Sequence, residues 1–346
     1  MVSENNLFAG SKIFNYVDRI TAFKENKNPA PINISLDLTY ACGHRCPKCT
    51  GDPKWKLNSK KIELSDEKFR KIFKQLYDYG ALSITFVGGG DTMTRPNCEK
   101  LITYADKLGL ETGLLTNGQI MSKKQANTLI PVLKFLRISL DASNPKMFSK
   151  THGMKDPAEF CKVLETIDTV VKTKKNTNSK CKIGVSYLTS ELTIKGMTVA
   201  TNIVKNIGVD YIQFKPFREN TTLIDKELIK CKKLETPTFK VLCSTPKYDL
   251  LKAHKGHRPN FCYAQQFSTQ IDPNGNVTIC CDHKGNPSMV IGNLNKQTFK
   301  QIWESTKRNK IINSINFNLC PKDCRGNQIN TLLYEILTPK EHAVFL

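Results

Sequence analysis

Three cysteines lie close together in one short stretch of the chain. Cys42, Cys46 and Cys49 follow a Cys-x3-Cys-x2-Cys spacing. Three thiolates on one tight loop can hold three irons of a cubane cluster and leave the fourth iron open to another ligand. A structural zinc site needs four protein ligands, and no further cysteine or histidine lies at a matching distance, apart from His44 inside the loop. The spacing therefore favours an iron-sulfur cluster, and a zinc site completed from elsewhere in the chain is the alternative.

A second group of cysteines lies in the last part of the chain. Cys262 is followed by twelve residues, a glycine, four residues and Cys280, and a Cys-x3-Cys pair formed by Cys320 and Cys324 comes later. Four such thiolates could hold a second cluster or a structural zinc ion. Cys281, next to Cys280, is a buried bystander, a replacement ligand for Cys280, or a thiol that donates hydrogen.

The elements that must position these cysteines alternate along the chain. Strand-like segments rich in β-branched and aromatic residues are typical of buried parallel strands, and amphipathic segments typical of helices separate them. In the clearest helix, Ser65 is placed to cap the first turn and Gly80 to end the last one. The six strand candidates are Ile32–Leu38, Leu82–Val87, Leu110–Leu115, Phe135–Leu140, Lys182–Leu188 and Val209–Phe214.

Six strand-helix units predict an α/β fold, a partial (β/α)6 barrel of the TIM type rather than a full eight-unit barrel. The active site is then expected at the carboxyl ends of the strands. We expect residues 1–30 to be a lead-in segment, 31–235 the barrel, and 236–346 a small α+β module. That module contains two short strands, Thr269–Ile271 and Val277–Cys280, and a single helix over Gln297–Ile312.

The Cys42 motif, in its place after the first strand, resembles the signature of the radical S-adenosylmethionine (radical SAM) enzymes. The resemblance covers about residues 32–220 and implies a 4Fe-4S cluster on Cys42, Cys46 and Cys49. It also implies contacts to S-adenosylmethionine (SAM) from the segments that follow or lie on later strands. In this sequence those residues are Gly88, Gly89, Gly90, Asp91, Ser139, Asp141, Ser186, Gln213 and Lys215.

The second cysteine group resembles an auxiliary-cluster domain of the SPASM type, in its shorter "twitch" version. The resemblance implies a second 4Fe-4S cluster held by four thiolates, and a Gly-Asn-Leu segment at 292–294 followed by a helix also matches the usual tail of such domains. The implied ligands are Cys262, Cys280, Cys320 and Cys324.

Composition limits the remaining function classes. The chain has 346 residues, of which 39% are hydrophobic and 13 are cysteines. This hydrophobic content is typical of a globular protein. The formal net charge of +21 favours an anionic binding partner. No run is long enough to span a membrane, and no signal peptide precedes the first strand. We therefore expect a cytoplasmic protein with reduced cysteines. Lys215 and Arg218, after the sixth strand, are placed to meet a phosphate or carboxylate.

The resemblance implies an enzyme that reductively cleaves SAM to a 5′-deoxyadenosyl radical, which abstracts hydrogen from a substrate, with flavodoxin or ferredoxin as reductant. We expect a small polar substrate such as a sugar, aminocyclitol or nucleotide, with oxidation, decarboxylation or epimerisation as the outcome. The reasons for this choice are that the C-terminal module is short and that no segment at the amino terminus resembles a dedicated peptide-binding domain. The alternatives are a peptide-modifying maturase or epimerase, a nucleic-acid-modifying enzyme, and a non-catalytic metal-binding protein that holds nucleic acid.

Overall fold

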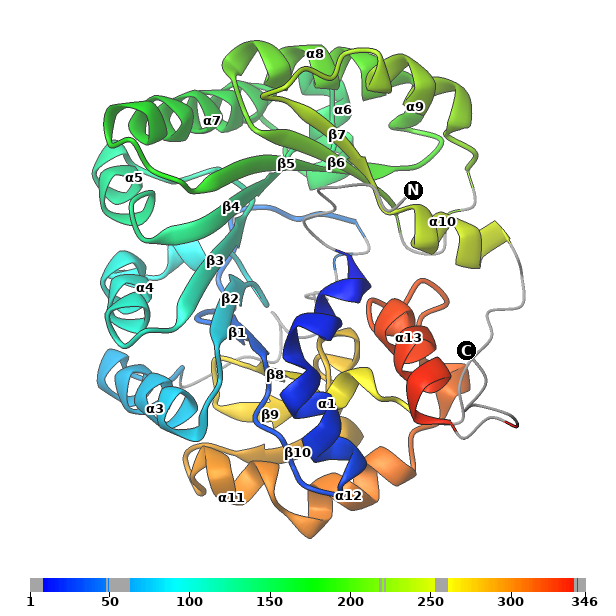
Figure 1. The fold of residues 1–346 in the computed structure, drawn as a ribbon. Coiled ribbons are helices and arrows are strands. Elements are labelled where there is room, and N and C mark those ends of the chain that lie inside the picture. Colours follow the sequence, from blue (N-terminus) through cyan, green and yellow to red (C-terminus); the bar gives the residue numbers. More distant parts are fainter. Residues whose placement is uncertain are drawn as a thin grey trace.

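A computed structural model describes residues 9–47, 49, 63–217, 220, 222–252, 261–338 and 341. These residues form one ten-stranded sheet with the order β10-β9-β8-β1-β2-β3-β4-β5-β6-β7. The strands β1 to β6 pair in parallel and in chain order. Figure 1 shows this part of the sheet as a curved wall with helices along its outer side. The predicted α/β class with a parallel sheet is confirmed.

The strand bounds agree with the sequence prediction to within two residues at each end for the six central strands. The four remaining strands are short and lie at the two edges of the sheet. The strands are β1 (Asn33–Asp37), β2 (Ser83–Val87), β3 (Glu111–Thr116), β4 (Leu133–Ser139), β5 (Lys182–Thr189), β6 (Tyr211–Pro216), β7 (Lys240–Cys243), β8 (Ser268–Ile271), β9 (Asn276–Thr278) and β10 (Val290–Asn293).

The helix α3 forms as its sequence predicts. The Ser65 hydroxyl accepts a hydrogen bond from the Lys68 backbone N–H, and Gly80 ends the helix with φ +97°, a conformation that glycine adopts without strain. The helices are α1 (Val17–Lys24), α3 (Asp66–Tyr79), α4 (Cys98–Lys107), α5 (Lys123–Leu129), α6 (Pro145–His152), α7 (Ala158–Asn176), α8 (Met197–Ile207), α9 (Asp225–Lys232), α10 (Thr245–Lys252), α11 (Phe299–Trp303), α12 (Thr306–Asn313) and α13 (Asn327–Leu337).

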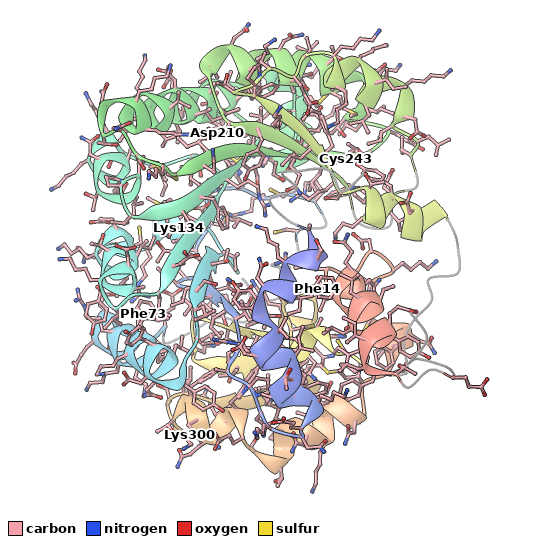
Figure 2. All side chains as sticks on the ribbon, viewed as in Figure 1. Phe14, Phe73, Lys134, Asp210, Cys243 and Lys300 are labelled. Carbon is pink, nitrogen blue, oxygen red and sulfur yellow. The ribbon has the colours of Figure 1, made fainter. Side chains whose placement is uncertain are left out.

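The hydrophobic core lies between the helices and the outer face of the sheet. Phe73 on α3, labelled in Figure 2, packs edge-on against Phe86 on β2 with ring centroids 5.9 Å apart. On β4, Leu136 and Ile138 are fully buried in this core. Successive side chains of a strand point to opposite faces, so the alternate residues Arg137 and Ser139 face the inner side of the curved sheet. The inner side is therefore the polar one.

The C-terminal part of the chain continues the sheet instead of forming a separate layer. β8 pairs in parallel with β1, and β9 and β10 follow it in antiparallel pairing. β7, which the sequence prediction omits, pairs in parallel with β6 at the other edge. The parallel part of the sheet therefore extends by one strand at each side of the six predicted strands. The division at residue 235 stays a prediction.

Two segments differ from their predictions. The expected lead-in contains a 3-10 helix, η1 (Gly10–Tyr16), and α1, and Ile13 and Ile20 pack with Phe267 and Leu333 in a small second core. The single helix expected over 297–312 is broken into α11 and α12, because the Ser305 hydroxyl accepts a hydrogen bond from the Arg308 N–H and starts a new helix there. Within the described residues, no helix combines the length and apolar character needed to cross a membrane.

Candidate active site and metal centres

The three cysteines of the first motif lie on the loop that leaves β1, where the curved sheet presents the carboxyl ends of its strands. Each is partly exposed. The Asn117 side-chain amide, just after β3, lies 3.6 Å from the Cys42 sulfur, and His152 Nδ1, at the end of α6, lies 3.5 Å from the Cys46 sulfur. Soft thiolate donors on a loop suit iron-sulfur chemistry.

A pair of histidines stands beside Cys46. His44 Nδ1 and His152 Nδ1 are 3.1 Å apart, and His152 Nε2 lies 3.0 Å from the Leu140 carbonyl oxygen. A carbonyl can only accept, so Nε2 of His152 carries a proton. The His152 ring stacks on Phe148 at 4.2 Å, and burial lowers its pKa. His152 is the last residue of α6, and the helix places its side chain in the interior.

The glycine segment after β2 packs directly against the cysteine loop. The Gly90 N–H donates to the Thr39 carbonyl at 3.0 Å, and the Asp91 N–H donates to the Ala41 carbonyl at 2.7 Å. A Cβ atom added to Gly90 would lie 1.9 Å from the Ala41 oxygen, so only glycine allows this approach. The predicted cluster loop and the predicted SAM amino-group loop are thus neighbours.

Asp91 has partners within the protein. Its carboxylate accepts from the Asn117 N–H at 2.6 Å, from the Met93 N–H at 2.9 Å and from the Thr116 hydroxyl at 2.9 Å. Burial raises the pKa of this carboxyl, while three donors stabilise its charged form. Asp91 therefore holds the ends of β2 and β3 together. Its contact with SAM stays a prediction.

The predicted residues on the later strands form a row. Ser139 on β4 is the register partner of Ser186 on β5, and Ser186 is the partner of Gln213 on β6. The Arg137 guanidinium donates to Gln213 Oε1 at 2.9 Å across the inner face. Residues in register on neighbouring strands project to the same face, so this row could contact one ligand along its length.

Asp141 and Lys215 lie just beyond that row. Asp141 has φ +46°, its Oδ1 accepts from the Leu188 N–H at 2.6 Å, and its Oδ2 lies 3.9 Å from His152 Nε2. Burial raises the pKa of Asp141. Burial, followed by the charge of Arg137, lowers the pKa of Lys215. Arg218, expected to meet an anion, lies outside the described residues.

The second cysteine group gathers around the short 3-10 helix η5 (Cys281–His283) and the loop before α13. His283 Nε2 lies 3.4 Å from the Cys320 sulfur, and the Asn330 amide lies 3.6 Å from the Cys262 sulfur. Burial first, and then Asp282 and Cys262 among its neighbours, raise the pKa of Cys324.

Cys280 and Cys281 have different surroundings. Burial, followed by the charges of Cys281, Asp282 and Cys324, raises the pKa of Cys280. Burial also raises the pKa of Cys281, but the neighbouring charge with the largest effect there is the Arg325 guanidinium, which acts to lower it. This supports Cys280 as the ligand, which stays a proposal.

These residues fit the groups that the sequence resemblance implies. Three thiols on one loop suit a cluster with an open iron, and the donor set of Cys262, Cys280, Cys320 and Cys324 would suit a fully ligated one. The glycine cradle leaves no room for a Cβ at Gly90. Sequence reasoning missed Asn117, His152 and the buried ion pair of Lys284 with Asp37. Of these residues, only Asp37 could have been singled out from the sequence, because an acidic residue inside an apolar strand segment is buried only when it is paired.

Comparison with known proteins agrees with this arrangement. The radical SAM superfamily model matches residues 36–185, and the SPASM iron-sulfur cluster-binding domain model matches residues 262–325. The subtilosin biosynthesis protein AlbA of Bacillus subtilis is 29% identical over 155 residues, 43% of this chain and 33% of that protein. The PqqA peptide cyclase of Rhodopseudomonas palustris is 27% identical over 124 residues, 36% and 32% of the two chains.

These alignments span about a third of the length of those relatives. Among solved structures, Streptococcus suis SuiB bound to its precursor peptide SuiA is similar with a TM-score of 0.66 at 14% identity, over 94% of this chain and 79% of that one. The SuiB structure with bound S-adenosylmethionine gives a TM-score of 0.68, also at 14% identity, over 91% and 76%. At this identity the likeness shows the shared fold.

Proposed function

We propose that this chain, which carries a radical SAM domain and a SPASM iron-sulfur cluster-binding domain, is an enzyme that modifies a peptide. The two domains imply SAM and two 4Fe-4S clusters as cofactors. The observation that carries the proposal is the packing of the Cys42 loop against the Gly90 loop, since this brings three thiols and a backbone cradle to one end of the sheet.

The expectation of a small polar substrate is wrong. The relatives that overturn it include a protein named as a PqqA peptide cyclase, and SuiB, whose structure contains a precursor peptide. The expectation relied on the lack of a recognisable peptide-binding segment, and such a lack is weak evidence. A peptide can bind through backbone groups and side chains of the sheet and its loops, which leave no sequence motif.

The residues of this chain have separate tasks in the proposed reaction. Cys42, Cys46 and Cys49 would hold one cluster, and Cys262, Cys280, Cys320 and Cys324 the other. When bound, the first cluster and SAM supply reductive cleavage and hydrogen abstraction. The glycine loop and the row formed by Ser139, Ser186 and Gln213 would orient SAM on the inner face. A flavodoxin or ferredoxin would supply electrons.

Isotope transfer tests the substrate class. Anaerobically reconstituted, reduced protein is incubated with SAM and a uniformly deuterated library of short peptides, and 5′-deoxyadenosine is analysed for deuterium by mass spectrometry. We expect deuterium in the product from the peptide library. A matched incubation with deuterated sugars, aminocyclitols and nucleotides is expected to give none. Transfer from that second panel alone would contradict the peptide assignment.

A further inference from the structure

One buried lysine joins the C-terminal module to the predicted SAM site. Lys284 follows η5, and its Nζ lies 2.6 Å from Oδ2 of Asp37, the last residue of β1. The same Nζ donates to the Gly88 carbonyl oxygen at 3.2 Å. The Lys284 side chain is 9% exposed and the Asp37 side chain is 0% exposed. A lysine is almost never buried unless it is paired, so this position is set by specific partners.

Both partners belong to the elements that position the first cysteine group. Asp37 ends the strand that leads into the Cys42 loop. Gly88 begins the glycine segment whose later residues hydrogen-bond to that loop through Thr39 and Ala41. One ammonium group therefore fixes β1 and the glycine loop relative to each other.

The other side of η5 faces the second cysteine group. His283, directly before Lys284, places Nε2 3.4 Å from the Cys320 sulfur. Cys280, another proposed ligand, lies directly before η5 in the chain. η5 is only three residues long, so the Lys284 ammonium and the Cys320 contact of His283 are joined by a short segment of chain. Ordering of the thiols around a metal group would therefore also set the position of the Lys284 ammonium.

We infer that Lys284 is a positioning residue that couples loading of the C-terminal cluster to SAM binding at the glycine loop. The inference rests on the proposed function, because it takes SAM as the ligand of the Gly88–Asp91 loop. Asp37 contributes by holding the ammonium in place. Removal of Lys284 takes the donor away from the Gly88 carbonyl, so the first residue of the glycine loop loses this contact, while the bonds of Gly90 and Asp91 to the cysteine loop remain.

The first experiment measures SAM affinity by equilibrium binding under anaerobic conditions, together with iron per chain. Lys284→Met alone leaves the buried Asp37 carboxylate without its cation, so the double variant Asp37→Asn with Lys284→Met is made as well, in which no charge is left unpaired. The control is Lys296→Met, an exposed lysine of the same module. We expect the Kd for SAM to be at least about tenfold higher in both Lys284 variants than in the wild-type protein. Iron content should match that of the wild-type protein, and Lys296→Met should leave both quantities unchanged.

The second experiment separates coupling from simple support of the fold. Cys324→Ala, which removes one proposed ligand of the C-terminal cluster, is introduced into the wild-type and the double-variant backgrounds. We expect it to weaken SAM binding about tenfold in the wild-type background and to have no further effect when Lys284 is absent.

Two results would overturn the inference. One is wild-type SAM affinity in a Lys284 variant that retains its iron, and the other is an equal loss of affinity on Cys324→Ala in both backgrounds. Failure of the wild-type protein itself to bind SAM would instead reject the proposed function, so the two claims are tested apart.

Discussion

At the scale of single residues, the thiol ligands could be predicted and their supporting partners could not. The spacing of Cys42, Cys46 and Cys49 is a local property of the sequence. The contacts of Asn117 with Cys42 and of His152 with Cys46 join residues from separate elements, and only the folded sheet brings these together. Asp91 was predicted as a SAM contact from its place in a motif, yet its carboxylate holds β2 and β3 together through Thr116 and Asn117.

Replacement of Asp91 tests this supporting role. Asp91→Asn keeps one acceptor oxygen but turns a donor group toward the Asn117 N–H. Hydrogen bonds to a charged group contribute about 1.5–3 kcal/mol each, so we expect the free energy of unfolding, from denaturant titration, to fall by about that amount. The control Asp168→Asn removes an exposed ion pair with Lys172 and should cost about 1 kcal/mol or less. Equal effects of the two changes would contradict the role.

At the scale of elements, the six central strands could be predicted because each is a short apolar run between clear turn or helix signals. The edges of the sheet could not be predicted in the same way. β7 and β10 are four residues each, which is too short for the alternation of apolar and polar residues to be recognised. Their pairing is determined by the strands beside them. The break between α11 and α12 has a local cause that apolar periodicity hides, namely the capping hydroxyl of Ser305.

Loss of that cap should weaken α12. Ser305→Ala removes the acceptor for the Arg308 N–H, and such a change typically costs about 1 kcal/mol. We expect a loss of that size in the free energy of unfolding. The control Ser314→Ala lies at the C-terminal end of the same helix, where the hydroxyl donates to a carbonyl, and should change stability by less. No difference between the two variants would show that Ser305 does not start the helix.

At the scale of the whole molecule, one continuous sheet carries both cysteine groups. β8 pairs directly with β1, so the strand that leads to the Cys42 loop lies beside the hairpin that leads to Cys280. Sequence patterns predicted two modules but not this shared sheet, because strand pairing over more than two hundred residues leaves no local signal. The buried pair of Lys284 with Asp37 is a direct consequence of the pairing.

Cleavage of SAM at the Cys42 loop is the central step of the proposed function. The decisive measurement is 5′-deoxyadenosine formed from SAM by anaerobically reconstituted protein after dithionite reduction. The control is the variant in which Cys42, Cys46 and Cys49 are replaced by alanine, which retains the C-terminal thiols. We predict product from the wild-type protein and none from the variant. Equal product from the two proteins, or zinc instead of iron at the wild-type thiols with no product, would contradict the account.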